Sequence, residues 1–262
     1  MKKSLILAVE TSSRAGSVAI ATGPQLKAEL TFSGQMKHSA ELFPAIRTLL
    51  DHIGRKQQDI EQVYISVGPG SFTGLRIAVT LAKAMHLANS SKIVSVDTLD
   101  VIAANVIDID SPSDEHRVSS VENRVSSIEL IAPILDAKRG QFYIAVYQRI
   151  SDERRATSIE YRESSIKPWK KLIPDSLMTA DEILDRFACK DKSIWLLGDG
   201  LVYHKDKFKA EGIYFFDEEF WSPRASKVHQ LGWQLALANQ FSDPLLLTPN
   251  YLLRPDIKLK KQ

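Results

Sequence analysis

The sequence predicts an α/β fold made of two similar lobes, and two observations carry this prediction. First, strand-like apolar runs alternate with helical patterns, and turn-rich segments separate them. Second, the segments ETSSRAGSVAI (10–20) and DAKRGQFYIAV (136–146) share an order of features: an acid at a strand end, a basic residue, a glycine and a second strand. Glu10 thereby corresponds to Asp136, and Gly16 to Gly140, which indicates an internal duplication.

Each half contributes a hairpin, further strands and covering helices. The near-continuous apolar run at 4–10 is typical of a strand that is covered on both faces. In the first half we expect strands at 4–10, 16–22, 25–32, 63–67 and 92–96, and helices at about 39–53, 73–88 and 98–106. In the second half we expect strands at 130–137, 141–148, 156–162 and 193–199, and helices at 179–188 and 226–241.

Two facing halves of this kind are the plan of the actin-like (ASKHA, ribonuclease H-like) fold, in which two duplicated lobes surround a cleft. We predict lobes at 1–107 and 130–262, with a last helix that can return to the first lobe. Residues 108–129 change character, because RVSSVEN is followed at once by RVSSIEL. Two heptads are too few to hold a coiled coil, so the segment is interpreted as an inserted linker.

Composition places the chain among ordinary globular proteins and excludes some classes. Of 262 residues, 44% are hydrophobic and 25% charged, and the net charge of +2 does not by itself indicate nucleic-acid binding. The single cysteine allows no internal disulfide, which fits a reducing compartment. The apolar run at 5–9 is too short to span a membrane. We therefore expect a cytoplasmic protein without membrane contact.

The segment GPGSFTGLR (68–76) resembles a phosphate-binding loop but has the wrong spacing. Thr73 stands where both a Walker A loop and a dinucleotide-binding loop counted from Gly68 need a glycine, and no lysine follows. The loop still precedes a helix, whose first backbone N–H groups can receive an anion. A purely structural strand-to-helix turn is an equal alternative.

The helix at 73–88 is apolar almost all round, with a polar stripe of Arg76, Thr80 and Lys83. Such a helix is either buried within its own chain or packed against a partner subunit. We expect Ala82→Arg to abolish partner binding without unfolding the chain.

The sequence offers no convincing set of catalytic groups. The six histidines are at least fourteen residues apart, which excludes the HxxxH and HExxH metal pairs, and no GxSxG segment occurs. Glu10, Asp136 and Asp199 could hold Mg²⁺ or orient water in an actin-like cleft, or simply cap turns. We predict neither a catalytic residue nor a metal site.

Five segments, in this order and at these spacings, resemble the TsaB family: ILAVETSSRAGSVAI, HSAELFPAI, GPGSFTGLRIAVTLAKAM, LDAKRGQFYIAVY and PNYLLR. The resemblance implies an actin-like, non-catalytic subunit required for N6-threonylcarbamoyladenosine in tRNA. Such subunits bind a TsaD-type paralogue, which transfers threonylcarbamoyl from its adenylate to adenosine 37 of ANN-decoding tRNAs. A TsaE-type ATPase joins the pair, tRNA is met through the complex, and the subunit alone forms a homodimer.

The resemblance also implies which residues serve these contacts. The partner surface consists of His38, Glu41, Leu42, Ala45, Ile46, Leu49, Thr73, Arg76, Ile77, Thr80, Leu81, Lys83 and Ala84. Residues at which phosphate or nucleotide could bind are Glu10, Thr11, Ser12, Gly68, Gly70, Ser71, Asp136, Lys138, Gly198 and Asp199. No strongly bound cofactor is expected, and ATP or ADP with Mg²⁺ would lie at a subunit boundary. The alternative is a stand-alone actin-like kinase that uses Glu10, Asp136 and the glycine loop.

Overall fold

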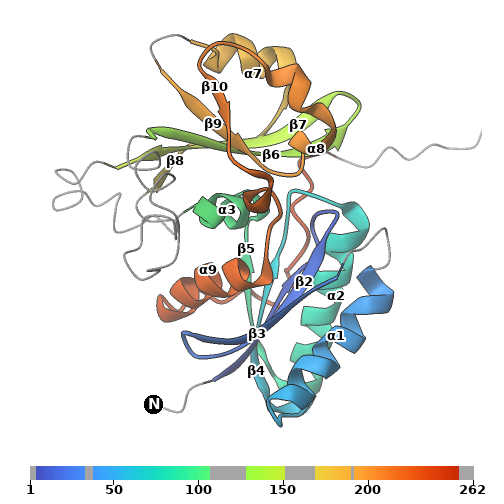
Figure 1. The fold of residues 1–262 in the computed structure, drawn as a ribbon. Coiled ribbons are helices and arrows are strands. Elements are labelled where there is room, and N and C mark those ends of the chain that lie inside the picture. Colours follow the sequence, from blue (N-terminus) through green and yellow to red (C-terminus); the bar gives the residue numbers. More distant parts are fainter. Residues whose placement is uncertain (1–3, 33–37, 107–127, 151–168, 190–191, 254–262) are drawn as a thin grey trace, which may run out of the picture.

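The first lobe is built on a five-stranded sheet. The computed structural model describes residues 4–32, 38–106, 128–150, 169–189 and 192–253. The strands are β1 (Leu5–Glu10), β2 (Gly16–Thr22), β3 (Gln25–Phe32), β4 (Ile60–Ser66) and β5 (Lys92–Val96), in the order β3-β2-β1-β4-β5 (Figure 1). β1, β2 and β3 pair antiparallel, whereas β4 and β5 run parallel to β1.

The second lobe repeats this plan. Its strands are β6 (Leu130–Lys138), β7 (Gln141–Arg149), β8 (Trp169–Thr179), β9 (Ile194–Leu197) and β10 (Ile213–Phe215). From β8 the spatial order is β8-β7-β6-β9-β10, with the same antiparallel and parallel pairings as in the first sheet. The duplication and the two-lobed actin-like α/β fold predicted from the sequence are thus confirmed.

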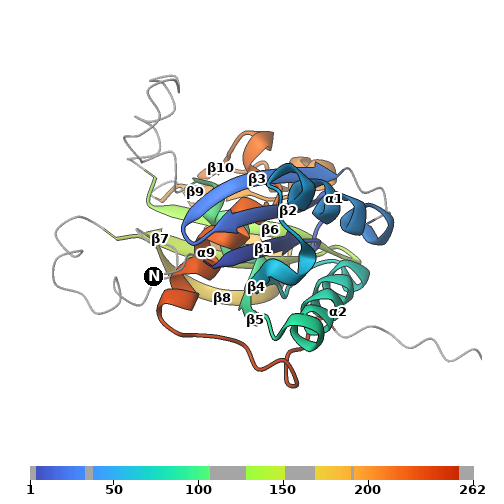
Figure 2. The ribbon, with the colours of Figure 1, turned by 90° about the horizontal axis from the view of Figure 1, so that it is seen from below.

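Helices cover the outer faces of the sheets, and two further helices lie between the lobes. In the first lobe, α1 (His38–His52) and α2 (Phe72–Asn89) lie side by side on one face of the sheet (Figures 1 and 2). α7 (Ala180–Phe187) packs on β8, and α8 (Leu201–His204) packs on β6. Short 3₁₀ helices are η1 (Gln57–Asp59), η3 (Lys205–Phe208) and η4 (Glu218–Phe220).

The two inner helices each pack against the sheet of the other lobe. α3 (Thr98–Ala103) follows β5 but contacts β6 and β7, and α9 (Ala225–Leu237) follows β10 but contacts β1, β2, β4 and β5 (Figure 1). One continuous core therefore joins residues of both sheets. Ile6 and Ala8 face this inner core, whereas Leu5, Leu7 and Val9 face α1 and α2. This alternation explains why β1 is apolar along its whole length.

Most predicted elements of the first lobe lie within a few residues of the observed ones. β8 was not predicted, because its apolar and polar residues do not alternate regularly and it contains Pro174, which a strand at the edge of a sheet tolerates. The strand predicted at 156–162 and nearly all of the predicted linker lie outside the described residues. At the end of that linker, Ile128 is buried in the core, so the packed second lobe already includes it. In the described parts of the chain, no helix has the length and apolarity needed to span a membrane.

Candidate functional site

Glu10 lies at the end of β1 and is fully buried. One carboxylate oxygen accepts hydrogen bonds from the Ser12 backbone N–H, at 2.6 Å, and from the Ser12 hydroxyl, at 2.5 Å. The other oxygen accepts one from the Ser66 hydroxyl on β4. Burial raises the pKa of Glu10 despite these hydrogen bonds, and the nearby charge of Asp199 adds to the effect. Glu10 therefore organises the turn by accepting hydrogen bonds from Ser12 and Ser66.

The glycine loop packs directly on the turn that follows Glu10. A side chain at Gly70 would overlap the backbone carbonyl of Ser12, and one at Gly74 would overlap that of Thr11. The Ser71 N–H donates to the Ser12 carbonyl at 2.6 Å, and the Thr11 hydroxyl donates to the Gly74 carbonyl at 2.8 Å. The glycines thus permit a close approach of two backbones, which is a structural use of the loop.

The start of α2 is also occupied from within the chain. The Ser71 hydroxyl accepts a hydrogen bond from the Gly74 N–H, and the Asn250 N–H donates to the Val67 carbonyl at 2.7 Å. The Tyr251 ring lies 5.0 Å from that of Phe72, the first residue of α2. These contacts favour the structural alternative for the loop, and phosphate contact at Gly68, Gly70 and Ser71 stays a prediction.

The second lobe presents its corresponding acid differently. Asp136 accepts hydrogen bonds from both the backbone N–H and the ammonium of Lys138, each at 2.7 Å, and His204 Nε2 lies 3.8 Å away. Partial burial acts to raise the pKa of Asp136, but the Lys138 contacts outweigh it, and the pKa is lowered.

Asp199 connects the two acidic turns. Burial raises its pKa to about 6, against the Arg14 backbone hydrogen bond and the Arg14 charge, while the charge of Asp136 raises it further. The Arg14 guanidinium also lies over the Tyr203 ring, 4.4 Å from its centroid. The structure therefore brings Glu10, Asp136 and Asp199 to one region between the lobes, as the duplicated turns predict.

Part of the predicted partner surface lies in the core of this chain. Leu42, Ile46, Leu49 and Leu81 are buried beneath α1 and α2 against the first sheet. The apolar periodicity of these four residues serves the chain's own sheet, and their contact with a partner stays a prediction. Ala82 is 0% exposed, so the predicted Ala82→Arg variant would disrupt this core before it tested any interface.

The other predicted residues do line the outer side of the two helices. Thr73, Arg76, Thr80 and Ala84 are exposed, whereas Glu41, Ala45, Ile77 and Lys83 are half-buried. The side chain of His38 lies outside the described residues. Three exposed large apolar residues of these helices were missed: Phe43 on α1, and Phe72 and Leu87 on α2, where Leu87 is 83% exposed and lies one turn after Ala84. Leu87 could have been found from its spacing of three residues after Ala84.

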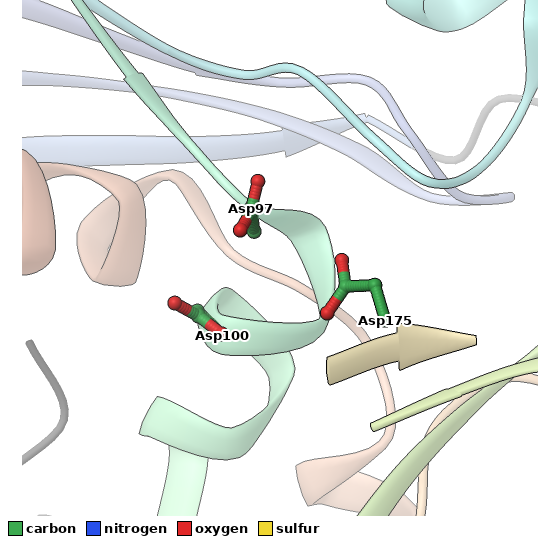
Figure 3. A group of neighbouring side chains, drawn as sticks. All are labelled: Asp97, Asp100 and Asp175. Carbon is green, nitrogen blue, oxygen red and sulfur yellow. The ribbon is translucent and has the colours of Figure 1, made fainter. Parts of the chain in front are cut away.

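One acidic group in the described residues has spacing suitable for a metal ion, and it was not singled out from the sequence. Asp97, Asp100 and Asp175 place one oxygen each within 4.8 Å of one another (Figure 3). However, the ammonium of Lys171 lies 2.5 Å from Asp100, 2.8 Å from Asp175 and 3.7 Å from Asp97. A protein side chain thus supplies the cation of this group, and we do not assign it as a metal site.

Comparisons with known proteins place the chain in a family. Residues 32–172, more than half of the chain, match the family model described as TsaD: tRNA N6-adenosine threonylcarbamoyltransferase. The chain is also 27% identical to the tRNA threonylcarbamoyladenosine biosynthesis protein TsaB of Bacillus subtilis, over 97% of this chain and 96% of that protein. The chain belongs to this family, in its TsaB/YeaZ group.

Further relatives of the TsaB/YeaZ group match over nearly the whole chain. The TsaB of Escherichia coli is 25% identical over 94% of this chain and 95% of that protein. The structure of YeaZ from Pseudomonas aeruginosa superposes with a TM-score of 0.71 at 18% identity, covering 95% of this chain and 100% of that one. The structural likeness concerns the fold. The family resemblance stated from five sequence segments is confirmed.

Proposed function

We propose that this chain is a non-catalytic subunit in the synthesis of N6-threonylcarbamoyladenosine in tRNA. In this role it binds a TsaD-type paralogue, which transfers threonylcarbamoyl to the tRNA adenosine. The names of the TsaB relatives support the pathway. The observation that carries the binding role is the exposed stripe on α2.

The stripe consists of Thr73, Arg76, Thr80, Ala84 and Leu87, which follow one another at helical steps of three and four. Two of these side chains are small hydroxyls and one is a methyl group, so a second helix can approach the backbone closely. Leu87 leaves 83% of its side chain in solvent, and burial of such a residue on binding is favourable. Since α1 lies beside α2, the two helices together offer a continuous docking face.

The remaining partners follow from the same role. A TsaE-type ATPase joins the pair, tRNA is met through the complex, and the α1–α2 face pairs two copies when the paralogue is lacking. ATP or ADP with Mg²⁺ would bind at a subunit boundary rather than strongly to this chain. The buried, hydrogen-bonded state of Glu10 supports this, because the group is already committed within its own lobe.

The second candidate is a stand-alone actin-like kinase. The grouping of Glu10, Asp136 and Asp199 between the lobes favours it, since carboxylates of this kind hold Mg²⁺ and orient nucleophiles. Against it stands the start of α2, where the Ser71 N–H is bonded to Ser12 and is unavailable to phosphate in this conformation.

The test is copurification with the TsaD-type paralogue of the same genome. Ala84→Arg places a long charged side chain in the middle of the stripe, and we expect at least about a tenfold loss of affinity. The matched control is Ala238→Arg, which introduces the same side chain at an exposed position after α9, on the opposite face of the sheet. Binding of Ala84→Arg at the level of the control would overturn the interface. ATP turnover by the purified chain with a small-molecule acceptor would favour the kinase instead.

A further inference from the structure

Segment 241–251, which follows α9, lies alongside α2. Ser242 pairs with Ile93 just beyond the end of α2, and its N–H donates to the Ile93 carbonyl at 2.8 Å. At the other end of the helix, the ring of Tyr251 lies 5.0 Å from that of Phe72, the first residue of α2. In Figure 2 the segment is part of the red coil that runs from α9 toward α2. The segment therefore follows α2 along its length.

Two leucines of this segment project into solvent from an ordered turn. Leu245 and Leu246 are 86% and 77% exposed, whereas Leu247 is buried in the core beneath α1 and α2. The Asp243 carboxylate accepts a hydrogen bond from the Leu245 N–H at 2.8 Å, and the Asp243 carbonyl accepts one from the Leu247 N–H at 2.9 Å. The turn thus fixes the backbone of the exposed pair, which lowers the entropic cost of burying it against a partner.

Leu87 lies on the side of α2 that faces this segment. It follows Phe72 by fifteen residues, which places the two side chains roughly 60° apart around the helix axis at 3.6 residues per turn. Since Phe72 contacts Tyr251, Leu87 lies on the same side, near the end of the helix. Leu245 and Leu246 follow within four residues of Ser242, which is paired beyond that same end. The three leucines therefore gather at one end of α2.

These three leucines are also the most exposed large apolar side chains in the described parts of the chain. Exposed apolar side chains that occur singly are normal in a folded protein. A group of them, in contrast, marks a surface that a partner covers. The end of α2 and the turn beside it therefore have the character of a docking surface.

The charged groups around these leucines are mainly positive. α2 contains Arg76 and Lys83 but no acidic residue, and β5 begins with Lys92, whose ammonium lies 4.6 Å from the centroid of the Phe241 ring. Asp243 is the one acidic residue of the segment, and its carboxylate is already hydrogen-bonded within the turn. Carboxylates on a partner would therefore be complementary to this surface.

We propose that Leu87, Leu245 and Leu246 form the apolar centre of a docking surface for the TsaD-type paralogue, so that segment 241–251 belongs to the interface together with α2. This inference rests on the proposed function. A stable interface buries about 800 Å² on each partner around an apolar centre. The stripe on α2 has one large apolar side chain, Leu87, at its end, and the segment supplies two more beside it. Opposite them, the paralogue should present apolar side chains bordered by acidic ones.

The experiment measures binding of the full chain to the purified TsaD-type paralogue of the same genome by titration calorimetry. The double variant Leu245→Ser/Leu246→Ser should bind at least about tenfold more weakly than the wild type. Its urea unfolding should match that of the wild type, because both side chains already lie in solvent. Leu172→Ser is the control, since this leucine is 50% exposed on β8, at the edge of the second sheet. It should bind like the wild type.

The outcomes distinguish this inference from the proposed function. Wild-type affinity in the double variant overturns the inference, and if Ala84→Arg has lost binding in the same assay, the proposed function stands. If the wild type itself does not bind the paralogue, both are wrong. If the double variant loses only the self-association of the chain and still binds the paralogue normally, the surface pairs two copies, and the inference is again wrong.

The positive charges give an independent test. Wild-type binding should weaken several-fold between about 0.05 and about 0.5 M salt, and Lys83→Gln should reduce this salt dependence. Binding that is equally tight at both salt concentrations would overturn the acidic border expected on the paralogue.

Discussion

In the first lobe, the turn after β1 is covered by the glycine loop, whose backbone lies against Thr11 and Ser12. In the second lobe, the corresponding turn after β6 is open, and a side chain added at Gly140 would meet no atom within 4 Å. The acids differ accordingly, since Glu10 is buried among hydroxyls whereas Asp136 is paired with Lys138. One duplicated hairpin thus gave a packed structural turn in one lobe and an accessible charged turn in the other.

The two lobes also differ in the helix that follows the fourth strand along the chain. After β4 the glycine loop leads into α2, which has 18 residues, whereas after β9 the segment Gly198–Gly200 leads into α8, which has four. Both loops approach another backbone closely. Side chains at Gly70 and Gly74 would meet the turn after β1, and side chains at Gly198 and Gly200 would meet Ile134 in β6. The glycines therefore serve the shared architecture, and the long helix with its exposed stripe is particular to the first lobe.

The largest effect is expected where the first turn is packed. In Gly74→Ala, the new methyl group would overlap the carbonyl of Thr11, the residue that follows β1. We therefore expect the free energy of unfolding to fall by about 3 kcal/mol or more. Gly140→Ala is the matched change in the second lobe, and its cost of about 1 kcal/mol comes only from the left-handed backbone at φ +76°. Urea unfolding of both variants measures the difference. Equal losses would contradict the contrast between a packed and an open turn.

The sequence predicted the strands and helices well where the pattern is local and strongly apolar, as in β1, β2 and α2. It could not say which surface the apolar side of a helix covers. Leu42 and Leu81 have the periodicity of an interface, but that periodicity is satisfied by the chain's own sheet. Likewise, the charged cluster at Asp97 depends on strand β8, whose irregular pattern and Pro174 gave no strand signal. Only the fold brings Lys171 to Asp100.

The positions of Glu10 and Asp136 could be predicted from the sequence, because the internal duplication relates them. Glu10 and Asp136 occupy corresponding places near the ends of β1 and β6, which follows from the repeated hairpin. Asp199 follows from its place after the fourth strand of the second sheet. The sequence could not reveal that Ser12 and Ser66 enclose Glu10, since Ser66 is 56 residues away and reaches it only through the pairing of β1 with β4.

The two acids should give opposite pH dependence of stability. The pKa of Glu10 is raised in the folded chain, so its contribution is greatest at low pH and declines as the pH rises through the folded pKa. Glu10→Gln should remove this decline. Above neutral pH we therefore expect its free energy of unfolding to exceed that of the wild type by an amount on the order of 1 kcal/mol. The pKa of Asp136 is lowered, so its contribution is present above the unfolded pKa and is lost as the pH falls through the folded one.

Asp136→Asn should therefore cost stability near neutral pH, by about 0.5–1 kcal/mol for a solvent-accessible pair, and should cost little in strong acid. The free energy of unfolding, measured against pH for both variants and the wild type, tests the pair of expectations. Parallel pH profiles for the two variants would show that the turns share one electrostatic environment, contrary to the structure.

The smallest expected difference lies at the caps of one helix from each lobe. Thr179 begins α7 with a full capping box, in which its hydroxyl accepts from the Glu182 N–H at 3.2 Å and the Glu182 carboxylate accepts from the Thr179 N–H at 2.7 Å. Ser71 begins α2 with one longer bond, 3.3 Å from the Gly74 N–H, while backbone packing on Ser12 already fixes the loop. We expect Thr179→Ala to cost about 1 kcal/mol and Ser71→Ala about half as much. Chemical denaturation resolves this difference, and a larger cost at Ser71 would mean that its hydroxyl, rather than the glycine packing, holds the start of α2.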